Sequence, residues 1–480
     1  MSNDPMRIHL SLVSHTNVGK TTLARTLLGR DIGEVADRAH VTETTDDYVL
    51  ARTPEGCELI LWDTPGFGNS VALAKRLEGR ANPVGWFLSE VWDRVANKSL
   101  WLNQKALKHV KETSSVVLYL VNATELPDSA PYVSAEMQIL EWIGKPVIVL
   151  LNQMGEPKSP EAEQADVDRW TYAMASYPIV NSVLPMDAFA RCWVQEFALF
   201  DAIAKALPEE LHATFDALQE VWSRKRRAAF SASIQAMAHY IEKLANDREV
   251  AESASIRDQL RFLGKRLGLF RNETVNDPIC AAQTALTSRA ADELCALTDK
   301  LIEINSLKGK GVKKELLQRL QSDWKITSAI PLAPAVAAGA ISSGIASGVV
   351  ADLTTGGLTM GLGTLVGMLA GALGGAGLTV AYNHKKEIDG TVITWSEEAL
   401  KKFLFEAICL YIAVAHFGRG RGNWHENEPP NCLIKTIKSK LGKKSTLDKL
   451  NYQSYINEII LDSLYARYTI NPTKTTCYLN

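Results

Sequence analysis

The chain of 480 residues lacks the usual marks of secreted, disulfide-linked and zinc-binding proteins. Its seven cysteines are scattered and include no C-x-x-C pair, which argues against a disulfide framework and a zinc site and for a reducing compartment. The first residues lack a basic region followed by an apolar core, so we expect no secretory signal and a cytoplasmic location. The formal net charge is only −2, so no strong positive field exists, and we expect no nucleic-acid partner.

A phosphate-binding loop is predicted near the N-terminus, in the stretch Ser14 to Thr22, which reads S-H-T-N-V-G-K-T-T. The apolar run 8–13 before it suits a buried strand, and residues 23–28 after it are spaced for one face of a helix. A strand, a Gly-Lys-Thr loop and a helix in this order predict a phosphate-binding loop. The pattern departs from its usual form at one place, because its first glycine is replaced by Ser14.

The residue types of this loop suit the chemistry of phosphate binding. Gly19 lets the backbone turn so that N–H groups face phosphate oxygens, and the helix that follows adds the positive end of its dipole. Lys20 is expected to place its ammonium near the β and γ phosphates. Thr21 is expected to offer its hydroxyl to Mg²⁺.

A second motif, Asp63-Thr64-Pro65-Gly66, follows two strands predicted at 48–53 and 57–62 and joined by a turn. An aspartate at the end of an apolar strand can hold Mg²⁺ through water. The N–H of Gly66 can bond the γ-phosphate, and loss of that phosphate on hydrolysis frees the loop. At this distance after a phosphate-binding loop, the motif predicts a nucleotide-dependent switch.

The motifs N-V-G-K-T, T-x-D at 45–47 and D-T-P-G-F at 63–67 together resemble the Era-like translation-factor class of P-loop GTPases. The whole chain resembles a bacterial family in which such a domain precedes a C-terminal domain of unknown function. The resemblance implies an α/β P-loop fold with a mainly parallel sheet, then a mostly α-helical domain. It also implies GTP and Mg²⁺ as ligands. Apolar runs at 116–121, 147–151 and 179–184 suit further strands of such a sheet.

Within this resemblance, three positions bear on hydrolysis. Thr45, in the polar loop before the second strand, is expected to reach Mg²⁺ and sense the γ-phosphate, although a turn or helix-cap threonine is the alternative. Phe67 stands where many small GTPases have a water-orienting glutamine, so we expect slow hydrolysis. Asn17 matches an asparagine that in some Era-like relatives helps to bind K⁺ near the phosphates; the alternative is that it only shapes the loop.

The guanine-reading motif is incomplete. Relatives have N-K-x-D after the strand at 147–151, whereas this chain reads N-Q-M-G, so only Asn152 remains to shape the base pocket. Glu156 comes one residue late for the missing aspartate. Asp187 and Ala188 fall where relatives place a loop against the base, and a helix-cap role for Asp187 stays open.

The predicted nucleotide site therefore combines residues of all these motifs. The residues expected to contact the nucleotide are Asn17, Val18, Gly19, Lys20, Thr21, Thr22, Asp63, Gly66, Asn152, Asp187 and Ala188. Thr21, Thr45 and Asp63 are expected around the metal, and Lys20, Asn17, Thr45 and Gly66 are expected to act in catalysis.

The chain is long enough for more than one domain. A GTPase domain is expected over 1–208, with a helical insertion at 68–112 whose helices we place at 84–95 and 100–110. The tryptophans and phenylalanine of this insertion indicate either a core or a nucleotide-gated surface for a protein partner. Helical spacing with almost no strand signals predicts an arm of antiparallel helices over 209–325, ahead of the remaining region to 480.

Residues 326–383 form a long apolar stretch in which Asp352 is the only charged residue. Glycines at every fourth position allow close helix packing, and lysines flank both ends, so we expect a helical hairpin. It would either insert in lipid at the cytoplasmic face of the inner membrane or pack as a soluble glycine-rich pair.

The region 384–480 is expected to hold a helix at 396–417, a basic tract that is either solvated or near lipid headgroups, and a short last helix.

Taken together, the sequence predicts a GTP-binding protein with slow hydrolysis, whose switch loops control a helical region that is placed at a membrane. Two other functions remain open. One is a nucleotide-binding switch or scaffold with negligible turnover. The other is a membrane effector that nucleotide triggers.

Overall fold

The computed structural model describes residues 5–28, 46–89, 98–154, 158–186, 193–252, 278–305, 382–387, 390–395, 397–416, 431–443 and 451–468. Its N-terminal part is built on a six-stranded sheet in the order β2-β3-β1-β4-β5-β6. All neighbouring pairs are parallel except β2 and β3. The strands are β1 (Arg7–Ser14), β2 (Asp46–Arg52), β3 (Glu58–Asp63), β4 (Val116–Asn122), β5 (Val147–Asn152) and β6 (Val180–Pro185). The predicted α/β class with a mainly parallel sheet is confirmed.

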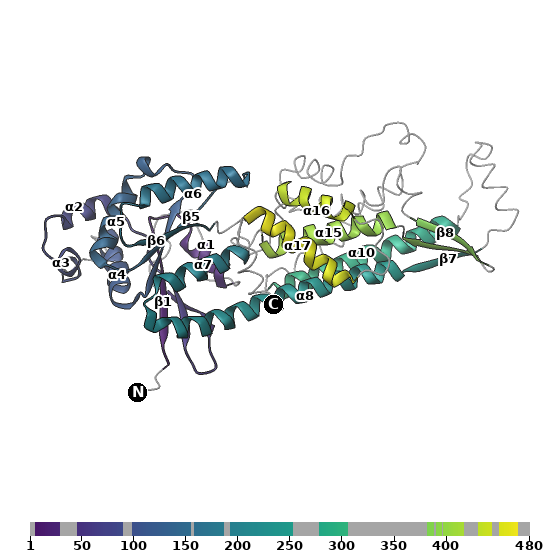
Figure 1. Cartoon of the computed structure of the whole chain (residues 1–480), viewed down its shortest axis with the longest axis horizontal. Coiled ribbons are helices and arrows are strands. Elements are labelled where there is room, and N and C mark those ends of the chain that lie inside the picture. Colours follow the sequence, from purple (N-terminus) through teal and green to yellow (C-terminus); the bar gives the residue numbers. More distant parts are fainter. Residues whose placement is uncertain are drawn as a thin grey trace.

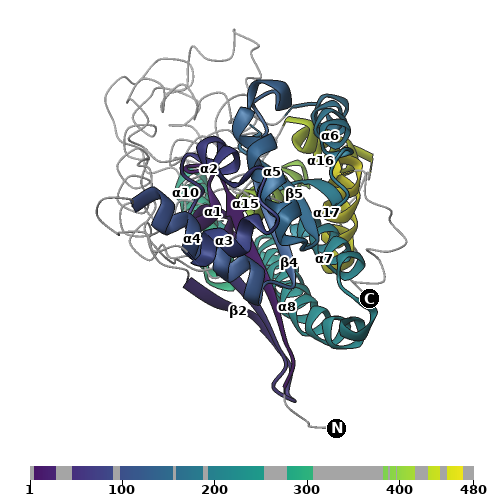
Figure 2. The same ribbon diagram turned by 90° about the vertical axis from the view of Figure 1, so that its left-hand side faces the viewer.

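Helices cover both faces of this sheet, because its central strands are apolar on both sides. On one face lie α1 (Lys20–Leu28), α7 (Trp193–Ala206) and part of α8 (His212–Asn246). On the other face lie α2 (Ser70–Leu77), α4 (Lys98–Thr113), α5 (Pro131–Ile143) and α6 (Pro160–Met174), with α3 (Pro83–Ser89) beside them. Figure 2 shows the helices α3 and α4 on one side of β4 and the helices α7 and α8 on the other.

The insertion contains three described helices, α2, α3 and α4, whereas only the last two were expected from its sequence. Residues 90–97, which include the end of the first expected helix, lie outside the described residues. Phe87 is fully buried in the core, but Trp86 and Trp101 are partly exposed. The guanidinium carbon of Arg80 lies 3.4 Å from the Trp86 ring centroid. The exposure of these side chains shows that some aromatic residues of the insertion belong to the core and others to the surface.

The helical region begins with α8, a single helix of 35 residues that runs from the α/β part along the length of the molecule (Figure 1). It packs with α10 (Pro278–Ile304), α15 (Glu397–His416) and α17 (Tyr452–Tyr468), and α16 (Asn431–Lys443) packs on α15 and α17. One continuous set of buried apolar side chains extends from β1 and α1 through α8 to these helices. The predicted helical class of this region is confirmed.

A small antiparallel sheet at the far end of α8 was not predicted (Figure 1). It has the order β7-β9-β8, with β7 (Arg248–Glu252), β8 (Tyr382–Glu387) and β9 (Gly390–Trp395). The expectation of an arm without strands is therefore wrong at β7. The predicted hairpin at 326–383 lies outside the described residues except for Tyr382 and Asn383, which open β8. Among the helices that the structure describes, none has the length and apolar character needed to cross a bilayer.

Candidate functional site

The turn between β1 and α1 is the loop that the sequence marked for phosphate binding. Its backbone has positive φ at Asn17 (66°) and Gly19 (95°), and α1 begins directly afterwards at Lys20. A Cβ added at position 19 would lie 2.6 Å from Nδ2 of Asn152. Both the φ value and the space therefore require glycine at this position.

Lys20 lies almost completely buried beneath this loop. Its Nζ donates a hydrogen bond of 3.0 Å to Oγ of Ser14, so the serine in place of the usual glycine supplies a hydroxyl partner. Burial lowers the pKa of the ammonium, while the nearby carboxylates of Asp63 and Glu136 act in the opposite direction. A phosphate bound here would favour the charged ammonium, because an adjacent anion raises the pKa of a buried amine.

Asp63, at the end of β3, contacts the first turn of α1. The hydroxyl of Thr21 donates to Oδ2 of Asp63 at 2.5 Å. The other carboxylate oxygen, Oδ1, is buried and has no hydrogen-bond partner among the described residues. Burial raises the pKa of this carboxyl above its usual range. A hydroxyl and a carboxylate with an unsatisfied oxygen form a donor set that fits a hard divalent cation such as Mg²⁺.

The loop after Asp63 lies directly against the phosphate-binding loop. A Cβ at Gly66 would lie 3.0 Å from Nζ of Lys20 and 3.1 Å from Cα of Thr16, so any larger residue would require a neighbouring group to shift. The N–H of Phe67 donates to the carbonyl of Ser14 at 2.9 Å. The Phe67 side chain is fully buried in the core, which agrees with its inability to orient water.

Asn152 and Gln153, at the end of β5, hold the phosphate-binding loop from the other side. Nδ2 of Asn152 donates to the carbonyl of Val18 at 2.6 Å, and Nε2 of Gln153 donates to the carbonyl of Asn17 at 3.2 Å. Gln153 has a positive φ of 53°. The glutamine that replaces the usual lysine thus still contacts the loop. Asn17 is exposed, and its backbone carbonyl forms this contact.

The remaining predicted site residues either are buried or lie outside the described residues. Val18 and Thr22 are buried. Thr45, Asp187 and Ala188 lie outside the described residues, as does Glu156. The structure therefore brings together Gly19, Lys20, Thr21, Asp63, Gly66 and Asn152.

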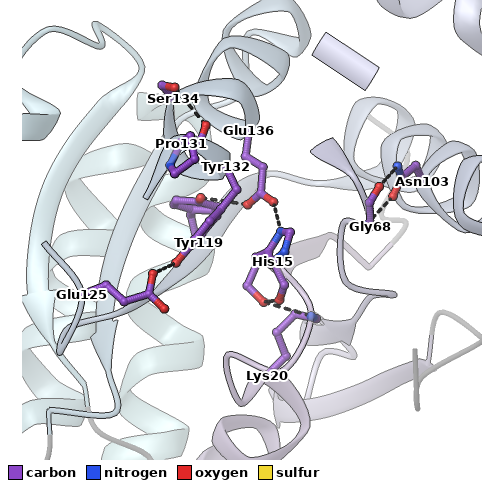
Figure 3. Close-up of polar contacts among 11 residues, drawn as sticks. His15, Lys20, Gly68, Asn103, Tyr119, Glu125, Pro131, Tyr132, Ser134 and Glu136 are labelled. Atoms are coloured by element: carbon purple, nitrogen blue, oxygen red, sulfur yellow. Dashed lines mark hydrogen bonds and ion pairs between the residues drawn. The ribbon is translucent and has the colours of Figure 1, made fainter. Parts of the chain in front are cut away.

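A buried polar network behind the phosphate-binding loop was missed by the sequence reasoning. Nδ1 of His15 lies 2.8 Å from Oε1 of Glu136, a fully buried residue of α5, and the Tyr119 hydroxyl donates to Oε2 of Glu136 at 2.8 Å (Figure 3). The His15 ring also stacks on Tyr132, with centroids 4.4 Å apart. Burial raises the pKa of Glu136. The signal that could have found this network is a glutamate on the apolar face of helix 131–143.

Comparison with known proteins assigns two parts of the chain. Residues 9–153 match a family described as 50S ribosome-binding GTPase, and residues 318–450 match a family described as Domain of unknown function (DUF3482). These two matches agree with the resemblance that the motifs carry.

Several solved structures share weaker similarity with the chain. Era in complex with MgGDPNP and a segment of 16S ribosomal RNA is 18% identical with a TM-score of 0.32, covering 52% of this chain and 73% of Era. An Era variant from Aquifex aeolicus bound to GDP·AlF4⁻ is 17% identical with a TM-score of 0.31, covering 60% of this chain and 88% of that one. A bacterial selenocysteine-specific elongation factor is 14% identical with a TM-score of 0.26, covering 42% and 28%.

The expectation of no nucleic-acid partner is contradicted by these findings. The Era structure contains ribosomal RNA, and the matching family is described as ribosome-binding. The physical reason for the error is that a net charge of −2 is a sum over 480 residues. Phosphate contacts depend on local groups of lysine and arginine, so the net charge does not exclude this class of partner.

Proposed function

We propose that this chain, which has an Era-like P-loop GTPase domain followed by a domain of unknown function, binds Mg²⁺–GTP, hydrolyses it slowly and uses its switch loops to set the state of the helical region. The observation that carries the proposal is the arrangement of Asp63. One carboxylate oxygen contacts the Thr21 hydroxyl at 2.5 Å, and the other is buried without a partner. Beside it lies the buried ammonium of Lys20.

Each group has a role in this proposal. Lys20 stabilises charge on the β and γ phosphates, and the backbone of the loop around Gly19 donates to phosphate oxygens. Thr21 and Asp63 hold Mg²⁺, which neutralises phosphate charge when bound. Gly66 stands within reach of the loop, where its N–H senses the γ-phosphate. We retain Thr45 as a further metal ligand, and Asn152 as a residue that shapes the base pocket.

Slow hydrolysis is proposed because the Phe67 side chain is buried and has no hydrogen-bonding group to orient water. K⁺ bound near Asn17 would then supply positive charge at the transition state. Steady-state GTP turnover by the full chain in KCl and in NaCl tests this point, and equal rates would exclude a K⁺ role. Turnover no faster than in the Lys20→Ala variant would favour a nucleotide-binding switch without hydrolysis.

Control of the helical region is proposed because α8 joins the two parts. Nη2 of Arg226 on α8 contacts Oε2 of Glu196 on α7 at 2.8 Å and donates to the carbonyl of Leu27 in the last turn of α1 at 3.2 Å. The stretch in which the sequence predicts the first switch loop follows α1 in the chain and lies outside the described residues. A movement of that loop would therefore act on the end of α1 that α8 holds.

The main test is equilibrium binding of fluorescent GTP, GDP and ATP analogues to the full chain. We expect guanine nucleotides to bind more tightly than ATP, and Lys20→Ala to lose at least about tenfold in affinity, because a charge-assisted phosphate contact is worth about 1.5–3 kcal/mol. Lys300→Ala changes an exposed lysine of α10 and serves as the matched control. Equal binding of ATP would contradict guanine selectivity, and no nucleotide binding would contradict the proposal.

A second candidate, a nucleotide-triggered membrane effector, is favoured by the apolar stretch 326–383 with its single charge at Asp352. Sedimentation with liposomes of anionic lipid compares the full chain with a deletion of 326–383. We expect the full chain to sediment and the deletion to remain in the supernatant. If both remain in the supernatant with GTP and with GDP, membrane association is wrong.

A further inference from the structure

We propose that Asn103 of α4 is a positioning residue that holds the loop 63–68 against the phosphate-binding loop, so that the helical insertion is part of the hydrolytic site. This proposal rests on the proposed GTPase function. It adds a residue from a segment for which the sequence suggested only core packing or a partner surface.

The contact between Asn103 and Gly68 uses both polar atoms of the side chain. Oδ1 of Asn103 accepts from the N–H of Gly68 at 3.0 Å, and Nδ2 donates to the carbonyl of Gly68 at 2.8 Å. Asn103 has no exposed surface. Figure 3 shows the amide facing the Gly68 backbone on the side of the site opposite to Tyr119. A buried amide that pairs with both backbone groups of one residue fixes the position of that residue in two directions.

The loop is also fixed at two further points. The hydroxyl of Thr64 donates to the carbonyl of Leu12 at 2.6 Å. The N–H of Phe67 donates to the carbonyl of Ser14 at 2.9 Å. Gly66 lies between these anchors and in close approach to Lys20. The position of Gly66 therefore depends on the Thr64 contact before it and the Phe67 contact after it. The next residue, Gly68, is held by Asn103.

A second set of contacts ties α4 to the strand that leads into the loop. The rings of His109 on α4 and Trp62 on β3 have centroids 4.3 Å apart. Nε2 of His109 lies 3.0 Å from Oγ of Ser11, and Nε1 of Trp62 donates to Nδ1 of His9 at 2.9 Å. Thus α4 contacts the residue before Asp63 and the residue after Phe67. The helix is attached at both ends of the loop that holds the metal and phosphate contacts.

The expected consequence is an effect on hydrolysis that exceeds the effect on binding. Loss of the amide leaves the buried N–H and carbonyl of Gly68 without these bonds, so the loop shifts to regain partners. A displacement of about 1 Å in a positioned group can reduce a rate about 100-fold. The phosphate contacts expected from the backbone around Gly19 and from Lys20 do not depend on Asn103, so nucleotide binding should be retained.

The test compares the full chain with Asn103→Leu and Asn103→Asp. Leucine removes both bonds, whereas aspartate can still accept from the Gly68 N–H but faces its carbonyl with an oxygen. The matched control is Gln104→Ala on the same helix, because Nε2 of Gln104 also donates to backbone carbonyls, those of Phe87 at 3.0 Å and Leu88 at 3.3 Å, away from the loop. Circular dichroism establishes that each variant is folded.

We expect kcat for GTP to fall about 10-fold to 100-fold in both Asn103 variants. The Kd for GDP should stay within about threefold of the wild type, and Gln104→Ala should keep its kcat. The preference for a non-hydrolysable GTP analogue over GDP should also fall in the Asn103 variants, since Gly66 contacts only the γ-phosphate. This second readout needs no turnover.

Two results would overturn the positioning role. One is an unchanged kcat and an unchanged preference for the GTP analogue in both Asn103 variants. The other is an equal loss of kcat in Gln104→Ala, which would indicate general destabilisation of α4. A wild-type chain that binds no nucleotide contradicts the proposed function instead, so the two failures are distinguishable.

Discussion

At the scale of single residues, some buried polar groups lie away from the candidate nucleotide site. Glu406 of α15 is an example in the helical region. Its Oε2 is buried and has no hydrogen-bond partner among the described residues. Burial raises the pKa of this carboxyl to about 7, although Lys438 and Lys402 act to lower it. The folded state therefore prefers the neutral acid.

This pKa shift predicts a pH-dependent stability. Between the ordinary value of 4.5 and about 7, the folded state holds a proton on Glu406 that the unfolded state has lost. The free energy of unfolding should therefore fall as pH rises through this window and become level above it. Since one pKa unit corresponds to about 1.4 kcal/mol, the contribution over the whole window is on the order of 3–4 kcal/mol.

Urea denaturation from pH 5 to pH 8 measures this contribution. Glu406→Gln should flatten the profile and be more stable than the wild type at pH 8, because glutamine cannot ionise. Glu458→Gln changes an exposed carboxylate of α17 and is the control, with a profile parallel to the wild type. Parallel profiles for all three proteins would show that Glu406 does not titrate in this window.

At the scale of elements, an ion pair of one arginine joins α8 to the α/β part, in addition to apolar packing. The side chain of Glu196 on α7 is completely buried, and Arg226 on α8, whose side chain is 16% exposed, forms an ion pair with it. Arg224, two residues earlier, pairs with Glu220 in a largely exposed position. These two arginines have similar chemistry and differ chiefly in burial.

Replacing these arginines should give unequal losses of stability. We expect Arg226→Met to lower the free energy of unfolding by about 3–5 kcal/mol, because it leaves the buried Glu196 carboxylate without this partner. Arg224→Met should change it by less than about 1 kcal/mol. Urea denaturation measures both, and equal losses would contradict the view that the pair joins α8 to α7. The double variant Arg226→Met with Glu196→Gln should recover part of the loss.

Some elements could be predicted from the sequence, and others could not. The strands of the parallel sheet are mostly continuous apolar runs, and the turn before Lys20 carries a motif typical of a strand–loop–helix unit. By contrast, β8 reads Y-N-H-K-K-E and has no apolar alternation. Its formation depends on pairing with β9, in which Ile393 and Trp395 alternate as buried residues. Strand formation of this kind is decided by tertiary context.

The site follows the same division. Glycine, lysine, threonine and aspartate at fixed spacing predicted a candidate nucleotide site, and the structure brings Gly19, Lys20, Thr21 and Asp63 together. The contacts of Asn103 and Glu136 were not predictable, because each joins residues 35 or 17 positions apart in the sequence through a fold that no local pattern specifies. An asparagine in an amphipathic helix, or a glutamate in an apolar helix, indicates a buried polar contact only once the position of the partner element is known.

At the scale of the whole molecule, the α/β part and the helical region share one continuous core. We therefore expect binding of GDP to protect both parts against unfolding. Nucleotide at 100 times its Kd adds about 2.7 kcal/mol to the free energy of unfolding. Hydrogen exchange with and without GDP should show slower global exchange in α15 and α17 as well as in β1 and β4. Protection confined to the α/β part would mean that the two parts unfold separately.

The length of α8 has a mechanical consequence. At about 1.5 Å per residue, its 35 residues form a rod of about 50 Å. Arg226, which contacts the end of α1, lies 20 residues before Asn246, so the part of α8 beyond it measures about 30 Å. A tilt of about 5° at Arg226 moves the end beside the small sheet by about 3 Å, by the geometry of a rigid helix. Under the proposed switch, a change of nucleotide state that moves a few atoms near Leu27 would thus displace the surface at the far end of α8 by about 3 Å, roughly two carbon–carbon bond lengths.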